Sequence, residues 1–150
     1  MSAGWRRTCL LMALALVLCA CSRSGTDEEQ IRAQIRAMTE ALESGNARAF
    51  VDGLADDFTG TTWNLDQRAV RLLLRREMMA HERIRARVFD IDVEMTGSER
   101  ARVSFHAVVT GGSGLVPDTG RWWRVETGWR KDGGQWQVIS ASWEPVVGRG

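Results

Sequence analysis

The chain has 150 residues and a formal net charge of +1 at pH 7. This length fits one domain that can bury its own hydrophobic core. The 20 basic and 19 acidic residues nearly balance, so the chain lacks the basic excess of nucleic-acid-binding domains. We therefore expect no nucleic-acid partner.

A short apolar segment opens the chain. Arg6 and Arg7 precede residues 9–20, CLLMALALVLCA, and polar sequence follows at once. Twelve helical residues rise only about 18 Å, whereas spanning a bilayer takes about 20 apolar residues. A basic start, a short apolar run and a small residue before the break are typical of a secretory signal peptide. We expect residues 1–20 to be such a signal rather than a spanning helix.

The end of this segment, Leu18-Cys19-Ala20-Cys21, resembles the lipobox of bacterial lipoproteins. The resemblance covers residues 1–21 and implies cleavage before Cys21, followed by acylation of its thiol and of the new amino group. Two or three acyl chains anchor a protein stably, at about 0.8 kcal/mol per buried methylene. Ser22 stands where an inner-membrane retention signal would have Asp. The expected location is therefore the cell envelope, at the periplasmic face of the outer membrane rather than the inner membrane.

Cleavage would simplify the chemistry of the remaining chain. Cys9, Cys19, Arg6 and Arg7 would leave with the signal, and no acidic residue would be lost, so the formal charge would fall from +1 to −1. Lipid would consume Cys21, the last thiol. This excludes cysteine-based catalysis and Cys-rich metal sites.

A first helix is expected after a tether that comprises residues 21–27. Its apolar residues Ile31, Ile35, Met38 and Leu42 are four, three and four positions apart, which places them on one face. Gly45 is placed to end this helix.

Two more helices are expected before residue 85. Asn46 can cap a second helix, ARAFVDGLADDF, which ends at Phe58. A short extended segment follows, and Asp66 then starts a third helix that runs to about Ile84. The side chains that share one face are Phe50, Val51, Leu54 and Phe58 on the second helix, and Val70, Leu73, Leu74, Met78 and His81 on the third.

The pattern changes to strict alternation after Arg85. VFDIDVEMT places apolar side chains on one face and acidic ones on the other, and RARVSFHAVVT alternates again after a Gly97-Ser98 turn. Two further strands, RWWRVETGWRK and QWQVISASWEPV, are joined by Asp132-Gly133-Gly134, a strong hairpin signal. Three helices followed by four antiparallel strands predict an α+β domain. The apolar sets are Phe89, Ile91, Val93 and Met95, then Val103, Phe105, Ala107 and Val109.

This order of elements resembles the nuclear transport factor 2-like superfamily, which includes the SnoaL-like polyketide cyclases and ketosteroid isomerase. The stretches ALESGNARAFVDGLADDFTG and TGWRKDGGQWQVISASW carry the likeness, which covers most of residues 28–144. It implies a domain over residues 28–147 whose three N-terminal helices pack on a strongly bent antiparallel sheet. The resulting cone often holds an apolar pocket and is often dimeric. No activity is implied, because one fold carries enzymes, binders and scaffolds.

Asp57, in the acidic pair Asp56-Asp57, is one candidate for chemistry. The pair lies where the second helix meets the extended segment, near the cone mouth in that superfamily. Paired carboxylates can act as general acid and base when burial separates their pKa values. The alternative is a solvated helix end with a turn cap.

His106 is the second candidate. It lies on the strand face opposite Val103 and Phe105. If the apolar face is concave, His106 points outward to solvent or to a dimer partner; otherwise it enters the pocket as a base or hydrogen-bond donor. Ketosteroid isomerase relies on a pocket Tyr, and this chain has none.

One pair and one triad of charged residues lie on the third helix. Glu77 and His81, four apart, could share a metal, but two ligands do not make a site and no third is marked, so we expect no metal and no cofactor. Arg68, Arg71 and Arg75 share a face that is either solvated or in contact with polar lipid.

Tryptophan is the unusual component of this sequence, with seven Trp and no Tyr. The adjacent Trp122 and Trp123 must point to opposite faces of their strand. Such rings could stack on a flat ligand or a sugar, or could fill the core and a dimer interface. The candidate ligand-binding residues are Phe58, Trp63, Trp123 and Trp143.

Three functions fit these observations. The first is a lipid-anchored envelope protein that is not an enzyme and binds a small apolar ligand or a protein partner, including a second copy through the sheet. The second is a pocket enzyme of the isomerase, dehydratase or cyclase type with Asp57 or His106 as general base. The third is a structural subunit of an envelope assembly.

Overall fold

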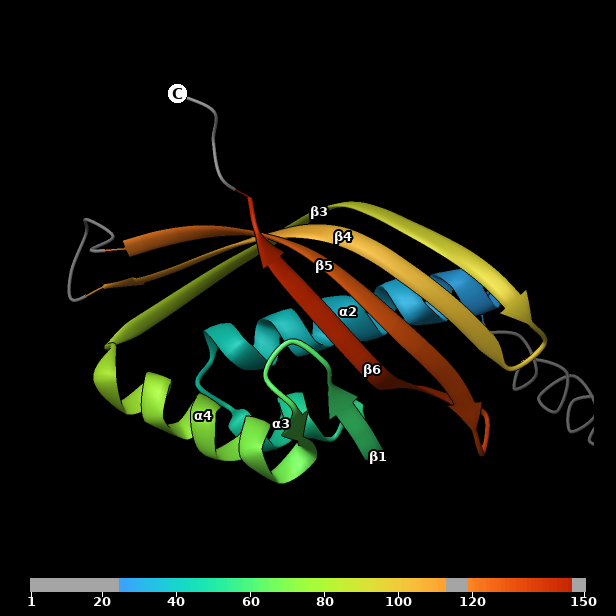
Figure 1. Cartoon of the computed structure of the whole chain (residues 1–150), viewed down its shortest axis with the longest axis horizontal. Coiled ribbons are helices and arrows are strands. Elements are labelled where there is room, and N and C mark those ends of the chain that lie inside the picture. Colours follow the sequence, from blue (N-terminus) through green and yellow to red (C-terminus); the bar gives the residue numbers. More distant parts are fainter. Residues whose placement is uncertain (1–24, 113–118, 147–150) are drawn as a thin grey trace, which may run out of the picture.

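The computed structural model describes residues 25–112 and 119–146 of the chain (Figure 1). The expected signal peptide and Cys21 lie outside these residues. No helix in the described part is long and apolar enough to cross a membrane. The elements, in chain order, are α2 (Asp27–Glu43), α3 (Ala47–Val51), β1 (Leu54–Gly60), β2 (Leu65–Asp66), α4 (Gln67–Ala80), β3 (Arg83–Gly97), β4 (Arg100–Gly112), β5 (Thr119–Asp132) and β6 (Gln135–Pro145).

Helix α2 confirms the first predicted helix. Ile31, Ile35 and Met38 are buried on one face, as their spacing predicts. The helix begins with a capping box that the sequence analysis did not identify: the Glu29 N–H donates to Thr26 Oγ1, and the Thr26 N–H donates to Glu29 Oε2. Gly45 follows the end of the helix with φ +71°, a conformation that glycine adopts without strain.

The second predicted helix is only partly correct. Asn46 caps it as expected, but α3 ends at Val51, and residues 54–60 form strand β1 instead of further helical turns. Leu54 is paired with Val138 of β6, and this pairing outweighs the local helical spacing. Gly53 lies in the bend between α3 and β1, where a Cβ atom would come 2.7 Å from Met38 Sδ of α2.

The third predicted helix begins where expected and ends early. Asp66 Oδ1 accepts a hydrogen bond from the Ala69 N–H at 2.7 Å. The helix stops at Ala80 because His81 is already extended, with φ −125° and ψ 124°. Ile84, which was expected to be helical, lies in β3.

The six described strands form one mixed sheet in the order β2-β1-β6-β5-β4-β3. The antiparallel pairing of β3, β4, β5 and β6 confirms the expected four-stranded part, and β1 adds a parallel neighbour to β6. Figure 1 shows the long strands arching over α2. We call the face of the sheet toward α2 the inner face and the opposite face the outer face.

The alternation predicted for residues 88–96 is wrong at one point, because a β-bulge interrupts β3. Asp90 has φ +53°, and the pairing of β3 with β4 shifts between Phe89 and Asp92. One extra residue in a strand reverses the direction of the side chains on one side of the bulge. Phe89 therefore pairs with His106 on the outer face, whereas Val93 pairs with Val103 on the inner face.

The core lies between α2 and the inner face of the sheet. Trp129 and Val103 are fully buried there, and the Trp129 indole N–H donates to Thr127 Oγ1 at 2.8 Å, so the largest buried ring has its polar atom satisfied. The other buried members are Ile31, Ile35, Met38, Leu54, Phe58, Ala101, Trp136 and Val138.

Candidate functional site

The inner face of the sheet is closely packed against α2, whereas the apolar side chains on the inward face of α4 are only half-buried. None of the residues of α4 is buried, although its inward face is apolar. Because the α2 end of the interior is filled by the core, any ligand inside the cone would enter at the α4 end. We call this region the open end. Its half-buried apolar side chains include Val70, Leu73, Leu74 and Met78 from α4, and Phe105, Val125, Trp123 and Trp143 from the sheet.

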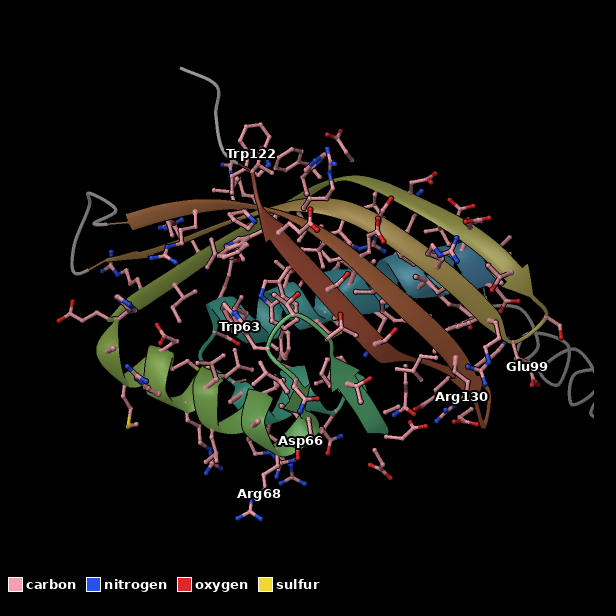
Figure 2. All side chains as sticks on the ribbon, viewed as in Figure 1. Trp63, Asp66, Arg68, Glu99, Trp122 and Arg130 are labelled. Atoms are coloured by element: carbon pink, nitrogen blue, oxygen red, sulfur yellow. The ribbon has the colours of Figure 1, made fainter. Side chains whose placement is uncertain are left out.

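Trp63 and Trp143 form an aromatic pair at the open end. Strand pairing places Trp143 on the inner face, opposite Val125. Trp63 comes from the turn between β1 and β2, and Figure 2 shows it between α4 and the sheet. The two ring centroids are 5.3 Å apart with an interplanar angle of 81°, and Trp63 remains 56% exposed. An edge-on pair with one open ring face can accept a flat apolar group.

The turn that carries Trp63 is held against β6. Thr62 Oγ1 accepts the Trp143 N–H at 3.0 Å and lies 3.2 Å from the Trp143 carbonyl oxygen. The next residue after Trp63, Asn64, has φ +51°. Nothing in the sequence marks Thr62, because a turn threonine gives no signal of a contact 81 residues away.

Of the four candidate ligand-binding residues, the structure brings Trp63 and Trp143 into contact and places Trp123 on the same inner face. Trp123 pairs with Ala107 and with Pro145. It precedes Val125 by two residues and Thr127 by four, so all three side chains lie on the inner face. Phe58 is different, because it is 4% exposed and belongs to the closed core.

Asp57 lies on the outer side of β1, away from the open end. Arg130 donates from Nη1 to Asp57 Oδ2 at 2.8 Å and from Nη2 to Oδ1 at 3.0 Å. These hydrogen bonds hold the pKa of the Asp57 carboxyl below its ordinary value. Arg130 also donates to Asp132, and the two carboxylates hold the pKa of its guanidinium above the ordinary value. Nothing in the sequence marks Arg130 as a partner of Asp57, since the two residues meet only through the order of the strands.

His106 lies on the outer face, because Val103 and Phe105 face α2. Its ring stacks on Phe89, with centroids 5.5 Å apart, and meets Trp122 edge-on at 6.0 Å. His106 Nδ1 is 3.4 Å from Asp90 Oδ2, within ion-pair distance, but this buried nitrogen has no hydrogen-bond partner among the described residues. We call Phe89, His106 and Trp122 the outer aromatic cluster.

The Glu77 and His81 side chains come together at the end of α4, with Nε2 3.6 Å from Oε2. No group of three potential metal ligands occurs among the described residues. The His81 ring packs on Gly111 of β4, where an added Cβ atom would come 3.0 Å from the ring. His81 therefore packs against β4 at the end of α4, and Glu77 contacts its ring from the preceding turn of the helix.

A hollow of about 380 Å³ lies on the outer face. Its lining residues come from the strands and their connections and none from a helix, so it is separate from the open end. Neither Asp57 nor His106 lines it. Arg100, Arg102, Glu126, Ser140 and Ser142 surround it, and Gly128 lies among them.

Comparison with known proteins identifies the fold. No family profile matches the sequence, and no curated protein matches it. Solved structures do match, and the fold is nuclear transport factor 2-like, also called cystatin-like. An NTF2-like protein from Novosphingobium aromaticivorans is 19% identical with a TM-score of 0.69, and the match covers 91% of this chain and 89% of that chain.

Two further neighbours are described as candidate dehydratases. A candidate scytalone dehydratase from N. aromaticivorans is 12% identical with a TM-score of 0.74, covering 81% of this chain and 85% of that one. A candidate dehydratase of the NTF2-like family from Streptomyces avermitilis is 19% identical with a TM-score of 0.69, covering 82% and 99%. At identities this low, the structural similarity shows a shared fold and no more than that.

Proposed function

We propose that this chain is a lipid-anchored cell-envelope protein that binds a small, flat, apolar ligand at the open end of its cone. The observation that carries the ligand proposal is the Trp63–Trp143 pair, in which one indole is packed and the other is 56% exposed. The turn is fixed to β6 by hydrogen bonds and keeps the Trp63 ring exposed to solvent. A ligand that covers such a ring gains binding free energy from the aromatic surface that it buries. The half-buried apolar face of α4 supplies the opposite wall.

The anchor part of the proposal is carried by the resemblance of residues 18–21 to a lipobox. Metabolic labelling with an alkyne palmitate analogue tests it, with labelling expected in the wild-type protein and lost in Cys21→Ala. Absence of label in the wild type, or label that survives Cys21→Ala, would contradict the anchor. Detergent fractionation of outer and inner membranes would test the expected location at the outer membrane.

The ligand part is tested with a chain that starts at Ser22 and the fluorescent probe 1-anilinonaphthalene-8-sulfonate, an anion whose aromatic rings are apolar. Trp63→Ala and Trp143→Ala are expected to weaken probe binding at least tenfold. Trp122→Ala is the matched control, because Trp122 is also a half-exposed indole but lies on the outer face. Equal weakening by all three substitutions, or none, would contradict a site at the open end.

A second candidate function is a pocket enzyme of the dehydratase type, favoured by the description of two neighbours as candidate dehydratases. Asp57 and His106 are the candidate general bases for such an enzyme. Both lie outside the cone interior, and a low pKa at Asp57 opposes proton abstraction near neutral pH. Asp57→Asn and His106→Ala test this candidate; loss of a biological activity with the fold intact would favour the enzyme over the carrier.

A homodimer through the sheet remains part of the proposal. The outer aromatic cluster gives it a central apolar contact, since Trp122 is 47% exposed beside Phe89 and His106. Sedimentation equilibrium of the wild type and of Trp122→Glu tests it. We expect a dimer in the wild type and a monomer in the variant; a wild-type monomer at high micromolar concentration would contradict the dimer.

A further inference from the structure

The exposed face of α4 combines positive charge with aliphatic side chains. Its members follow the helical spacing i, i+3, i+4, i+7, i+8 and i+11, so they form one continuous stripe. Leu72 and Met79, which are 59% and 82% exposed, add two large apolar side chains to this face. The stripe consists of Arg68, Arg71, Leu72, Arg75, Arg76 and Met79, and we call it the α4 stripe.

Its four guanidinium groups are not neutralised within the described part of the molecule. No ion pair or side-chain hydrogen bond of the described residues involves Arg68, Arg71, Arg75 or Arg76. The two carboxylates nearest in sequence are engaged elsewhere: Asp66 caps the helix, and Glu77 pairs with His81. Figure 2 shows Arg68 pointing away from the sheet, into the space outside the domain.

We propose that the α4 stripe rests on an anionic phospholipid surface, with its guanidinium groups on the lipid phosphates and Leu72 and Met79 at the boundary of the acyl chains. Guanidinium groups bind phosphate through two parallel hydrogen bonds. The binding of a helix to a bilayer surface grows with the apolar area that it buries there and with the attraction of its basic residues to anionic lipids. The open end of the cone, lined by the opposite face of α4, would then lie close above the bilayer.

Other occupants fit the stripe less well. Two copies of the stripe would bring eight guanidinium groups face to face, which opposes self-association through α4. A nucleic acid would satisfy the four charges but would leave Leu72 and Met79 without apolar partners. A bilayer surface satisfies both kinds of side chain at once.

The proposal rests on the proposed anchor only for bringing the domain to a membrane. Five residues separate Cys21 from Asp27, the first residue of α2. An extended chain spans at most about 3.6 Å per residue. An anchored domain would therefore stay within roughly 20 Å of its lipid, close enough for one of its faces to lie on the bilayer.

Vesicle sedimentation tests the α4 stripe without the anchor. The chain from Ser22 is suitable, because the domain from residue 25 to 146 carries its own core. We expect it to bind vesicles of phosphatidylglycerol and phosphatidylcholine, to lose binding as salt rises, and to ignore pure phosphatidylcholine vesicles. Each Arg→Gln substitution in the stripe should lower the partition coefficient roughly fivefold.

A matched control separates the stripe from net charge. One variant carries Arg→Gln at positions 68, 71, 75 and 76, and the control carries Arg→Gln at the exposed Arg36, Arg85, Arg87 and Arg124. The stripe variant should bind anionic vesicles no better than neutral ones, while the control variant keeps most of its binding. Circular dichroism confirms that both are folded.

Three results would overturn the proposal: no binding of the wild type to anionic vesicles, equal loss in both variants, or binding to duplex DNA as tight as to vesicles. Leu72→Ser with Met79→Ser should weaken vesicle binding while leaving its salt dependence; unchanged binding would contradict the acyl contact. Labelling at Cys21 is independent of all these outcomes, so failure of the anchor and failure of the stripe are distinguishable.

Discussion

Arg130 joins Asp57 through two hydrogen bonds although the residues are 73 positions apart in the chain. Asp57 lies on β1 and Arg130 on β5, and β6 runs between these strands. The ion pair therefore connects two strands that do not pair with each other. It gives Asp57 a structural role in holding β1 to the sheet.

Asp57→Asn should lower the stability of the fold in a pH-dependent way. The folded-state pKa of Asp57 lies below its ordinary value, so the ionised carboxylate stabilises the fold above about pH 4, the pKa of an unfolded aspartate. That contribution disappears as the pH falls through the folded pKa. Urea unfolding at pH 7 and pH 3 measures the difference between wild type and variant.

The exposed neighbour Asp56 supplies the control for this prediction, because no described side chain pairs with it. Asp56→Asn should leave the urea midpoint nearly unchanged at both pH values. A difference between wild type and Asp57→Asn that is as large at pH 3 as at pH 7 would show that the ion pair is not its source.

Gly128→Ala should lower the stability of the domain through overpacking, by at most about 1 kcal/mol because the atom it meets ends a side chain that can rotate. A Cβ atom at Gly128 would come 2.6 Å from Ser140 Oγ on the neighbouring strand β6. Removing that oxygen relieves the clash, so Gly128→Ala combined with Ser140→Ala should be at least as stable as Ser140→Ala alone. Thermal unfolding of the four proteins measures the coupling, and additive effects would contradict the contact.

Two substitutions of Asp90 test the β-bulge that places Phe89 on the outer face. Its φ of +53° is strained for most side chains, so Asp90→Gly should keep or raise stability, whereas Asp90→Val should lower it by roughly 1–2 kcal/mol. Both variants lose the carboxylate near His106, which makes them a matched pair. Equal melting temperatures for the two would show that the backbone conformation carries no cost.

Ile31→Ala tests the closed core. Ile31 is fully buried on α2 against the inner face of the sheet, and such truncations cost about 2–5 kcal/mol. Ala33→Gly is not a suitable control because it changes helix propensity; Arg36→Gln on the exposed face of α2 should shift the urea midpoint little. A small effect at Ile31 would mean that this end of the cone is not tightly packed.

Local signals in the sequence predicted much of the fold. The stripe of α2, the caps at Asn46 and Asp66, and the Gly133-Gly134 hairpin turn all follow from side-chain spacing or backbone preference within a few residues. The opposite facing of Trp122 and Trp123 follows from strand geometry alone.

Long-range pairing accounts for what the sequence did not predict. Phe58 has the spacing of a helical residue, yet its strand is fixed by β6, some 80 positions later. Phe89 leaves the inner face because one residue is inserted in β3, and alternation of residue types carries no mark of that insertion. The Trp63–Trp143 pair and the Asp57–Arg130 pair depend on the same strand order.

The most direct test of the central claim uses the indole N–H signals of the chain from Ser22. Six Trp residues remain in it, and single substitutions assign their signals. Titration with an uncharged naphthalene probe, followed by ¹H–¹⁵N NMR, should shift the Trp63 and Trp143 signals strongly and Trp123 less, while Trp122 on the outer face stays unchanged. Shifts centred on Trp122, or no shifts at all, would contradict a ligand site at the open end of the cone.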